Sequence, residues 1–327
     1  MQKVVVIGAA VMDVLLKSNG LKVVKSHEVP GGVAMCEMIG GKLEAEESLV
    51  TSGGGGTNVA VALHRLGEAV KMISRIGSDD LGEVMIKQLE REGVDLSMLQ
   101  KGEGKTGVSV VLVSPDGGRS IVTYRGESGL IDSREIDWEE MKKADWIQIS
   151  SLGGEMNFLE DIVTFAMTSG IKIGVNPGKK ELEQKGRLLK LLPKFDLFNI
   201  NRMEASLLLG VDYEDEKEMV KKMADMGAKG LSITDGKRGA SVVVNRRWLK
   251  MEAFSVKSVD DTGAGDAFVS GVVSGILQYR NPEDFLKMGL ANGGNKVTKL
   301  GAKDGLLYKD EMEGWMKKKL KMVEEIV

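Results

Sequence analysis

The sequence is poor in several residue types on which common functional sites depend. Its one cysteine, Cys36, cannot form an internal disulfide, which suits a reducing compartment. Its two histidines, His27 and His64, leave almost no material for a histidine-rich metal site or a histidine-based catalytic triad. The 45 basic and 48 acidic residues nearly balance, so the net charge of -3 predicts no surface for nucleic acid or anionic membranes.

Long apolar runs are also lacking. No stretch approaches the roughly 18 uncharged apolar residues of a membrane-spanning helix. The apolar start of the chain is interrupted by Asp13 and has no small-residue cleavage site after it, so we expect no export signal. These absences predict a cytoplasmic protein. With 327 residues, of which 42% are hydrophobic, the chain can form one large domain or two of ordinary size.

Glycine, in contrast, is abundant and accounts for 42 of the 327 residues. Several familiar glycine motifs are nevertheless missing. No G-x-G-x-x-G joins an expected strand to a helix, as dinucleotide binding requires, and no G-x-S-x-G occurs. The GKT at residues 104–106 resembles the end of a P-loop, but Leu99 stands where the first glycine of that loop is required. The glycine clusters therefore indicate another chemistry.

Short β-branched runs alternate with helix-forming segments along most of the chain. Such repeated βα units predict an α/β fold with three α/β/α layers, in which helices cover both faces of a mostly parallel central sheet. The expected strands are 4–8, 69–76, 145–150, 171–175, 196–200 and 229–234, and the expected helices are 82–92, 157–168, 203–209, 216–226, 265–279, 282–297 and 309–323.

Two stretches break this alternation. Residues 15–52 are rich in charge and glycine, and residues 107–124 contain two apolar runs around a PDGG turn, which is typical of a hairpin. They are either two decorated loops or, as we expect, one small β-sheet lid over the loops at the ligand-binding edge. The predicted division is an α/β core at 1–14, 53–106 and 125–327, with the lid in between.

The strongest chemical signal is DDTGAGD at residues 260–266, directly before an apolar helix. Gly263, Ala264 and Gly265 would leave the N–H groups at the helix start unobstructed, and with the helix dipole these groups form an anion site. This suits phosphoryl transfer, in which the N–H groups stabilise the phosphoryl group and Asp266 takes the proton of the attacking hydroxyl. A turn whose carboxylate favours the helix dipole would explain GAGD alone, but the full string favours the anion site.

A second cluster, GGGGTN at residues 53–58, begins another apolar helix. Gly54 and Gly55 let the backbone approach a ligand closely, and Asn58 offers both a donor and an acceptor. Asp13 follows the first expected strand, at the ligand-binding end of an α/β sheet, where it could accept from two neighbouring hydroxyls. These residues suit a polyhydroxylated ligand. The alternatives are a flexible loop with an asparagine cap and a solvated turn aspartate.

Weaker signals lie at two later strand ends. Asn201 and Glu204 form a capping-box pattern, and they could otherwise hold water around a Mg²⁺ ion. Thr234, Gly236 and Gly239 belong to TDGKRG, which ends one strand and starts a hairpin. An Asp-Gly turn explains this string, whereas its threonine and glycines could otherwise contact nucleotide phosphates.

Together these motifs resemble the signatures of the PfkB family of carbohydrate kinases, which have the ribokinase-like fold. DDTGAGDAF is similar to the C-terminal signature of the family and GGGGTNVAVALHRLG to the N-terminal one, with SRIGSDDLG at the usual place after it. The resemblance covers residues 4–305. It implies a kinase that transfers the γ-phosphoryl of ATP to a hydroxymethyl group of a small sugar or sugar derivative, fructose- or ribose-like or 2-keto-3-deoxygluconate-like.

The resemblance also implies roles for single residues, with Asp266 as the catalytic base beside the anion hole of Gly263, Ala264 and Gly265. The sugar side would comprise Asp13, Gly54, Gly55 and Asn58, and the nucleotide side Asn201, Thr234, Gly236 and Gly239. Glu204 would hold Mg²⁺ through water. Asp260 and Thr262, with Gly301 in the same loop, match a position where many relatives bind a monovalent cation such as K⁺. In many relatives the lid is also a dimer surface, which implies a homodimer here.

The sequence departs from the patterns of individual family members where the acceptor would bind. Ribokinases resemble Gly-x-x-Asn-x-Asp after the first strand, but Val11 stands at the Asn position and cannot supply the amide that helps to hold ribose. Tyr124 and Arg125 are similar to a Tyr-Arg pair of 2-keto-3-deoxygluconate kinases, in which the arginine clamps a carboxylate. Their second arginine is replaced by Gly178-Lys179.

Other functions are compatible with an α/β chain of this kind. A nucleoside kinase on the same fold is the nearest alternative. A non-catalytic sugar or nucleotide sensor is disfavoured by the intact Asp266 and its anion hole, and a dinucleotide-dependent oxidoreductase by the missing glycine fingerprint.

Overall fold

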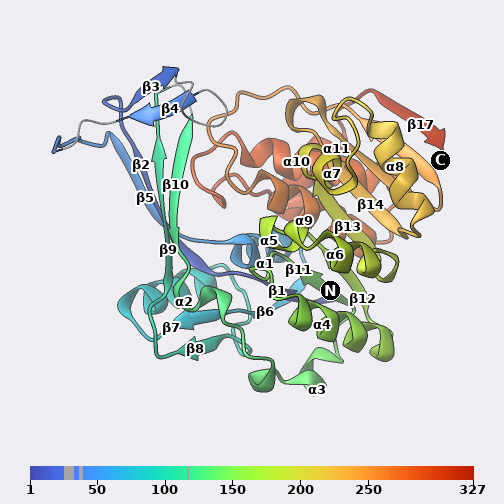
Figure 1. Cartoon of the computed structure of the whole chain (residues 1–327), viewed down its shortest axis with the longest axis horizontal. Coiled ribbons are helices and arrows are strands. Elements are labelled where there is room, and N and C mark those ends of the chain that lie inside the picture. Colours follow the sequence, from blue (N-terminus) through green and yellow to red (C-terminus); the bar gives the residue numbers. More distant parts are fainter. Residues whose placement is uncertain (26–32, 37–39, 116–117) are drawn as a thin grey trace.

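The computed structural model describes the whole chain except residues 26–32, 37–39 and 116–117, so the PDGG turn and part of the expected lid lie outside the described residues. The described residues form a central sheet of nine strands (Figure 1). In spatial order its strands are β17 (Met322–Ile326), β16 (Arg247–Met251), β15 (Ala240–Val244), β14 (Gly230–Thr234), β13 (Leu197–Asn201), β12 (Lys172–Val175), β11 (Trp146–Ile149), β1 (Lys3–Ile7) and β6 (Ala69–Ile73). The strands from β14 to β6 are parallel, and β15, β16 and β17 are antiparallel.

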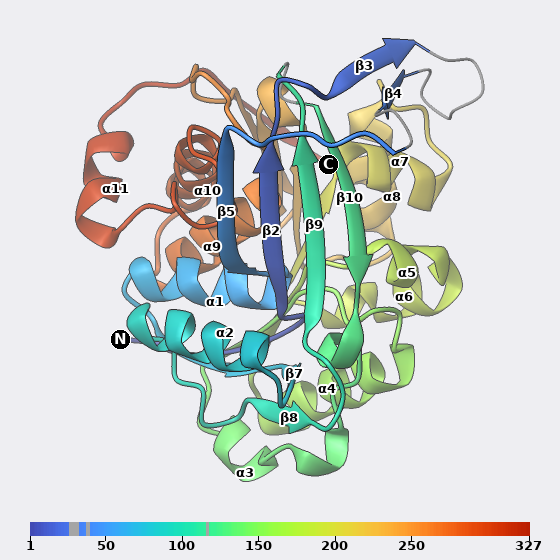
Figure 2. The same cartoon turned by 90° about the vertical axis from the view of Figure 1, so that its left-hand side faces the viewer.

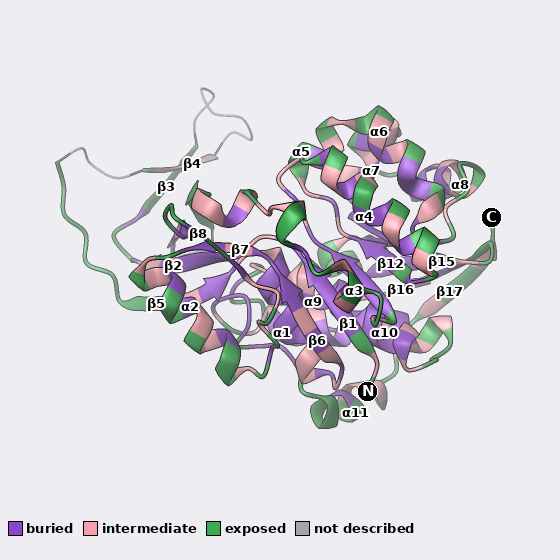
Figure 3. Ribbon diagram, turned by 90° about the horizontal axis from the view of Figure 1, so that it is seen from below, coloured by how far each residue is buried: buried purple, intermediate pink, exposed green. Residues whose placement is uncertain are grey.

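Helices cover both faces of this sheet, and most of its strands are buried between them (Figure 3). In β1, Val4 and Val6 point to one apolar core and Val5 and Ile7 to the other, as the two-residue period of a strand requires. One core is covered by α1 (Gly55–Arg65), α2 (Asp80–Arg91), α9 (Ala264–Leu277), α10 (Pro282–Lys296) and α11 (Lys309–Met316), and the other by α3 (Trp138–Met141), α4 (Met156–Ser169), α5 (Lys179–Glu183), α6 (Lys185–Leu191), α7 (Arg202–Leu209) and α8 (Glu216–Asp225). Among the helices described, none combines the length and apolarity needed to cross a bilayer.

A second, smaller sheet projects from the body of the molecule (Figures 1 and 2). Its strands, in order, are β10 (Arg119–Tyr124), β9 (Gly107–Val113), β2 (Val11–Lys17) and β5 (Glu47–Gly53), and we call it the small sheet. β2 follows β1 closely and β5 leads directly into α1, so the small sheet is anchored beside the carboxyl end of the parallel strands. The predicted α/β/α fold with a mostly parallel sheet and a small separate sheet is confirmed.

Short elements complete the described structure. The strand pairs are β3 (Lys22–Lys25) with β4 (Val33–Cys36) and β7 (Arg75–Gly77) with β8 (Gln100–Gly102), and the 3-10 helices are η1 (Gly126–Gly129), η2 (Ser133–Glu135), η3 (Leu192–Lys194) and η4 (Gly236–Arg238). The strand expected at 69–76 is therefore two strands, β6 and β7, interrupted at Ser74.

The helix expected at 309–323 is wrong in its second half. α11 ends at Met316, and residues 322–326 form β17, which pairs antiparallel with β16. The intervening KKKLK carries too little apolar surface to extend an amphipathic helix against the core. The outer backbone groups of β16 would be unpaired without β17, and this tertiary pairing overrides the local helix preference.

Candidate active site

The two glycine motifs, distant in the sequence, meet near the carboxyl end of the parallel strands. β1 ends there at Ile7, and α1 and α9 pack against each other (Figure 1). Asn58 in α1 donates from Nδ2 to Oδ2 of Asp266 in α9 at 2.9 Å, across 208 residues of sequence. Ligands of open α/β sheets bind at this edge. The structure thus brings together residues predicted from both motifs.

The start of α9 has the open geometry that an anion site needs. Gly263 caps the helix with a φ of 74°, a left-handed conformation that favours glycine. A β-carbon on Gly263 would also come within 2.8 Å of Ala302. The space beside Gly265 is open, because a β-carbon built there would meet no described residue outside its own turn within 4 Å. The first N–H groups of a helix have no partner within it. The Ala264 N–H donates to the carbonyl of Asp261 at 3.2 Å, and the groups that follow it, from Gly265 on, can bind an anion.

Asp266 is a half-buried carboxylate in the first turn of α9, held by the amides of Asn58 and Asn176. Burial raises the pKa of Asp266 to about 6, against the lowering effect of these amides and of the positive charge of Lys303. A carboxylate with this pKa accepts a proton more readily than an ordinary aspartate and is still mostly ionised at neutral pH. Asp266 therefore has the position and basicity of a general base.

Lys303 is a buried part of this site that sequence reasoning missed. Its ammonium donates to the carbonyl of Ser52, to Oγ1 of Thr57 at 2.8 Å and to Oδ1 of Asn58 at 2.9 Å. Because a lysine can only donate and a carboxylate can only accept, these contacts fix the Asn58 amide with Nδ2 toward Asp266. Burial lowers the pKa of Lys303, and the nearby carboxylates oppose this shift. A single lysine in a loop has no local pattern that could have revealed this role.

Asp13 reaches the site from β2 of the small sheet and is buried. Its carboxylate bonds the side chain of Ser109 in the neighbouring β9, and burial raises its pKa, against the positive charge of Lys303. A β-carbon on Gly53 would lie 1.9 Å from Oδ2 of Asp13, so only glycine leaves room for this carboxylate. On Gly55, a β-carbon would lie 1.9 Å from Oγ of Ser150. The glycine run thus lets polar groups approach the start of α1, which Gly54 caps with a φ of 86°.

A row of polar side chains, also missed from the sequence, supports Asp266 from beneath. Ser232 in β14 donates to Oδ1 of Asn199 in β13 at 2.6 Å, and Asn199 donates from Nδ2 to Oδ1 of Asn176 at 2.9 Å. Asn176, just after β12, bonds the Asp266 carboxylate in turn. The row runs from β14 through β13 to the residue after β12 and orients the amide that faces Asp266. Its one visible signal was the place of Asn176 directly after an expected strand.

The residues predicted for the nucleotide side lie at neighbouring strand ends. Asn201 and Thr234 are register partners at the ends of β13 and β14. The capping box is confirmed, because Oδ1 of Asn201 accepts from the Glu204 N–H at 2.8 Å and Oε2 of Glu204 accepts from the Asn201 N–H at 3.1 Å. Gly236 and Gly239 have φ angles of 53° and 104° in the turn between β14 and β15, so turn geometry by itself explains both glycines.

A Mg²⁺ ion would depend on ligands from the substrate. In the ranges that the structure covers, no group of three or more Asp, Glu, His and Cys could hold a metal ion. Mg²⁺ typically binds through one or two carboxylates together with water and phosphate oxygens. Glu204 uses Oε2 for the capping box, and burial raises its pKa. Its carboxylate fits an ion that arrives with a phosphate group and is held through water.

The predicted monovalent-cation position at Asp260 and Thr262 already holds a cation of the chain itself. Oδ1 of Asp260 accepts from the N–H and the hydroxyl of Thr262 at 2.9 and 2.7 Å, and Oδ2 accepts from the Gly301 N–H at 2.9 Å. The ammonium of Lys296 donates to the Asp260 carbonyl at 2.5 Å. Burial lowers the pKa of Lys296 to about 8, which leaves it mostly protonated at neutral pH. These residues do not fit an additional K⁺ ion.

Arg125 follows β10 and has an exposed side chain. Its backbone carbonyl accepts from the hydroxyl of Ser128 at 2.7 Å, which shapes the start of η1. In the part of the chain that the structure describes, no hydrogen bond or ion pair joins its guanidinium to Asp13 or Asp266. Arg125 thus lies at the end of β10, at the base of the small sheet, and its contact with a substrate stays a prediction.

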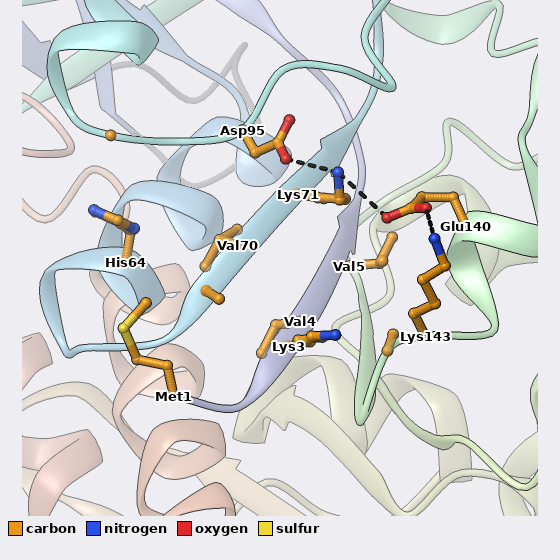
Figure 4. A pocket seen from close by; sticks show the side chains of 13 residues that line it. Met1, Lys3, Val4, Val5, His64, Val70, Lys71, Asp95, Glu140 and Lys143 are labelled. Carbon is orange, nitrogen blue, oxygen red and sulfur yellow. Dashed lines mark hydrogen bonds and ion pairs between the residues drawn. The ribbon is translucent and has the colours of Figure 1, made fainter.

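A cavity of about 290 Å³ lies elsewhere, beside the amino-terminal part of β1 and β6 (Figure 4). Two of its lysines are paired with its two carboxylates, with Lys71 2.7 Å from Asp95 and 3.5 Å from Glu140, and Lys143 2.5 Å from Glu140. It is lined by Lys3 at the start of β1, whereas the cluster around Asp266 lies near the end of that strand. This cavity does not belong to the candidate active site.

Comparison with known proteins agrees with this geometry. A family model described as pfkB family carbohydrate kinase matches residues 1–307. The chain is 28% identical to a ribokinase of Haemophilus influenzae over 278 residues, which are 83% of this chain and 89% of that protein. It is 26% identical to fructokinase-1 of Oryza sativa subsp. japonica over 283 residues, 79% of this chain and 86% of that protein.

Solved structures share the fold. A ribokinase of Thermotoga maritima superposes with a TM-score of 0.78 at 22% identity, over 97% of this chain and 100% of that one. A nucleoside kinase of Burkholderia thailandensis in complex with inosine has a TM-score of 0.75 at 16% identity, over 96% of this chain and 97% of that one. The family model spans nearly the whole chain and the fold is that of ribokinase, and we conclude that the chain belongs to the pfkB family of carbohydrate kinases.

Proposed function

We propose that the protein transfers the γ-phosphoryl of ATP to a hydroxymethyl group of a small sugar or sugar derivative. Membership of the family makes it a phosphotransferase that acts on an alcohol group. One observation carries the finer proposal: Asp266, with a pKa raised to about 6, lies in the first turn of α9, beside the unobstructed N–H groups of that helix. A base and an anion site side by side are what in-line phosphoryl transfer requires.

The proposed reaction places the acceptor hydroxyl between Asp266 and the γ-phosphorus. The hydroxyl oxygen forms the new O–P bond as the bond from phosphorus to the bridging oxygen of ADP breaks, and the proton passes to the Asp266 carboxylate. The N–H groups at Gly263, Ala264 and Gly265 stabilise the charge on the transferred group. When bound, Mg²⁺ would neutralise charge on the ATP phosphates, with Glu204 as its link to the protein through water.

The acceptor would lie between the small sheet and α1. Asp13 is the buried carboxylate there that can accept from two hydroxyls of a sugar, and Lys303, whose charge lowers the pKa of Asp13, donates to Asn58. We further propose that the small sheet acts as a lid that excludes water, which would suppress hydrolysis of ATP. Its edge strand β10 exposes Ile121 and Val122, at 49% and 72%, and a homodimer through the small sheet would cover this apolar surface.

A coupled ADP-release assay with ATP and Mg²⁺ tests the proposed function. The acceptor panel contains ribose, fructose, 2-keto-3-deoxygluconate, inositol, nucleosides and sugar phosphates. We expect one sugar or sugar derivative to have a kcat/KM far above the rest, and a preference for the sugar acid would assign Arg125 to its carboxylate. If a nucleoside is the best acceptor, the proposed function becomes that of a nucleoside kinase instead of a sugar kinase. If the protein binds ATP but releases no ADP with any acceptor, the result would favour a non-catalytic sugar or nucleotide sensor.

The pH dependence of kcat/KM should report the basicity of Asp266. Only the ionised carboxylate can accept the proton, so kcat/KM should be level near about pH 7 and fall about tenfold for each pH unit well below pH 6. Asp13 also has a raised pKa and titrates as a neighbour of the same lysine. The Asp13→Asn variant should therefore bind the acceptor more weakly but retain the fall of kcat/KM at low pH, which we call the acid limb. Loss of that limb in Asp13→Asn would instead assign it to Asp13.

A further inference from the structure

Lys296, the last residue of α10, is fully buried, with 0% of its surface exposed. Its ammonium donates to the carbonyl of Asp260 at 2.5 Å and lies 3.8 Å from Oδ2 of the same residue. A buried ammonium is strongly unfavourable unless oxygen atoms compensate its charge. The side chain of Lys296 thus places a positive charge, compensated by these oxygen atoms, at Asp260 in the 260–262 loop.

This loop controls the place of the anion site. The N–H groups of Val259 and Asp260 both donate to the carbonyl of Val297, at 2.7 and 3.2 Å, which ties the loop to the chain just after Lys296. At its other end the loop leads directly into Gly263, the cap of α9. A charge fixed at Asp260 therefore holds the segment that presents the N–H groups to the phosphoryl group.

The Asp260 carboxylate has few oxygen lone pairs left for an ion from solution. Besides its bonds to Thr262 and Gly301, Oδ1 lies 3.5 Å from Nη1 of Arg119, which reaches over from β10 of the small sheet. K⁺ and an ammonium group carry the same charge, and both are bound by carbonyl and carboxylate oxygens. An ion bound to the Asp260 carbonyl would compete with Lys296 for the same oxygen and repel its charge.

We propose that Lys296 is an internal substitute for a monovalent cation, so that the kinase works without K⁺. The inference rests on the proposed phosphoryl transfer for its effect on rate, but the occupation of the loop by Lys296 is independent of the reaction. Lys296 is a positioning residue, because it acts on the anion site through the 260–262 loop rather than by contact with a substrate.

The first test uses the wild-type protein. kcat/KM is measured with the chloride salt of K⁺ replaced stepwise by tetramethylammonium chloride at constant ionic strength, which keeps screening unchanged. We expect a change of less than about twofold, well below the roughly 5- to 150-fold effect of a typical linked ligand. The melting temperature should be equally indifferent to K⁺. Activation of the wild type by K⁺ beyond about fivefold, within that range, would overturn the proposal.

The second test removes the Lys296 ammonium from the 260–262 loop. In tetramethylammonium, Lys296→Ala should lose at least about tenfold in kcat/KM, a loss of about 1.4 kcal/mol in transition-state stabilisation, and K⁺ or NH₄⁺ should restore most of it. K⁺ should also raise the melting temperature of Lys296→Ala but not that of the wild type. Lys296→Met keeps the apolar stem of the side chain, so K⁺ should restore less of its kcat/KM.

Lys299→Ala is the matched control, since it removes the same charge from an exposed side chain three residues later and should behave as the wild type does. A folded Lys296→Ala that keeps the wild-type rate without K⁺, or that responds to K⁺ in neither rate nor melting temperature, would overturn the proposal. If neither variant folds, the wild-type titration still decides. If no acceptor is phosphorylated, the proposed function fails, while the melting temperatures still test the role of Lys296.

Discussion

Replacement of Asp266 by asparagine is expected to lower kcat by at least about 100-fold, because a positioned general base typically contributes ~10²- to 10⁴-fold. The amide keeps the shape of the carboxylate and can still accept from Nδ2 of Asn58, but it cannot take the proton of the acceptor. The fold and the affinity for ATP should therefore be retained. Steady-state kcat with the best acceptor, a thermal melt and calorimetric titration with ATP measure the three quantities.

Asp284→Asn is the matched control for this substitution. Asp284 lies in the first turn of the neighbouring helix α10, just as Asp266 lies in the first turn of α9. Both substitutions remove one charge that interacts favourably with a helix dipole, an effect of typically about 0.3–1 kcal/mol on stability. In Asp266 the burial that raises its pKa outweighs this effect, so the melting temperature of Asp266→Asn should not fall. Asp284→Asn should change stability by no more than the dipole effect and leave kcat within about twofold. A wild-type kcat in Asp266→Asn would remove Asp266 from the mechanism and leave it a capping residue.

The fold was predictable because its buried strands carry a local signal. β1, β11, β12, β13 and β14 are short apolar runs separated by helix-forming segments, and such repeats allow few arrangements other than a covered parallel sheet. The last strand, β17, has no such signal. It is stabilised by its pairing with β16, whose residues come some 70 positions earlier, as the pairing of Lys250 with Val323 shows. A pattern within a window cannot contain that information.

The candidate site divides in the same way. Its glycines and Asp266 stand out in the sequence because they occupy consecutive positions directly before an apolar helix, and their roles stay a prediction. Asn176, Lys296 and Lys303 do not stand out, since each is a single residue supplied by a different segment and acts through atoms far away in the sequence. The Asn201 and Glu204 pattern illustrates the converse: it specifies a helix cap, which the structure contains, and says nothing definite about a metal.

Lys303→Met should damage both stability and catalysis. The substitution leaves three buried acceptors, in Ser52, Thr57 and Asn58, without their donor, and each unsatisfied buried group costs about 1–3 kcal/mol. We therefore expect a clear fall in the free energy of unfolding. The Asn58 amide also loses the bond that fixes its orientation toward Asp266, so kcat/KM at pH 7 should fall at least about tenfold, a loss of about 1.4 kcal/mol. Lys299→Met, on the surface, is the control.

The pH profile of Lys303→Met separates an electrostatic role from a purely structural one. The charge of Lys303 lowers the pKa of Asp266, so its removal should raise that pKa above its present value of about 6 and move the acid limb of kcat/KM to higher pH. A lysine that only packed the core would lower the melting temperature and leave the limb in place. A folded Lys303→Met with an unshifted limb would therefore contradict the coupling, whereas a shifted limb would mean that one buried charge sets both the orientation and the basicity of the catalytic carboxylate.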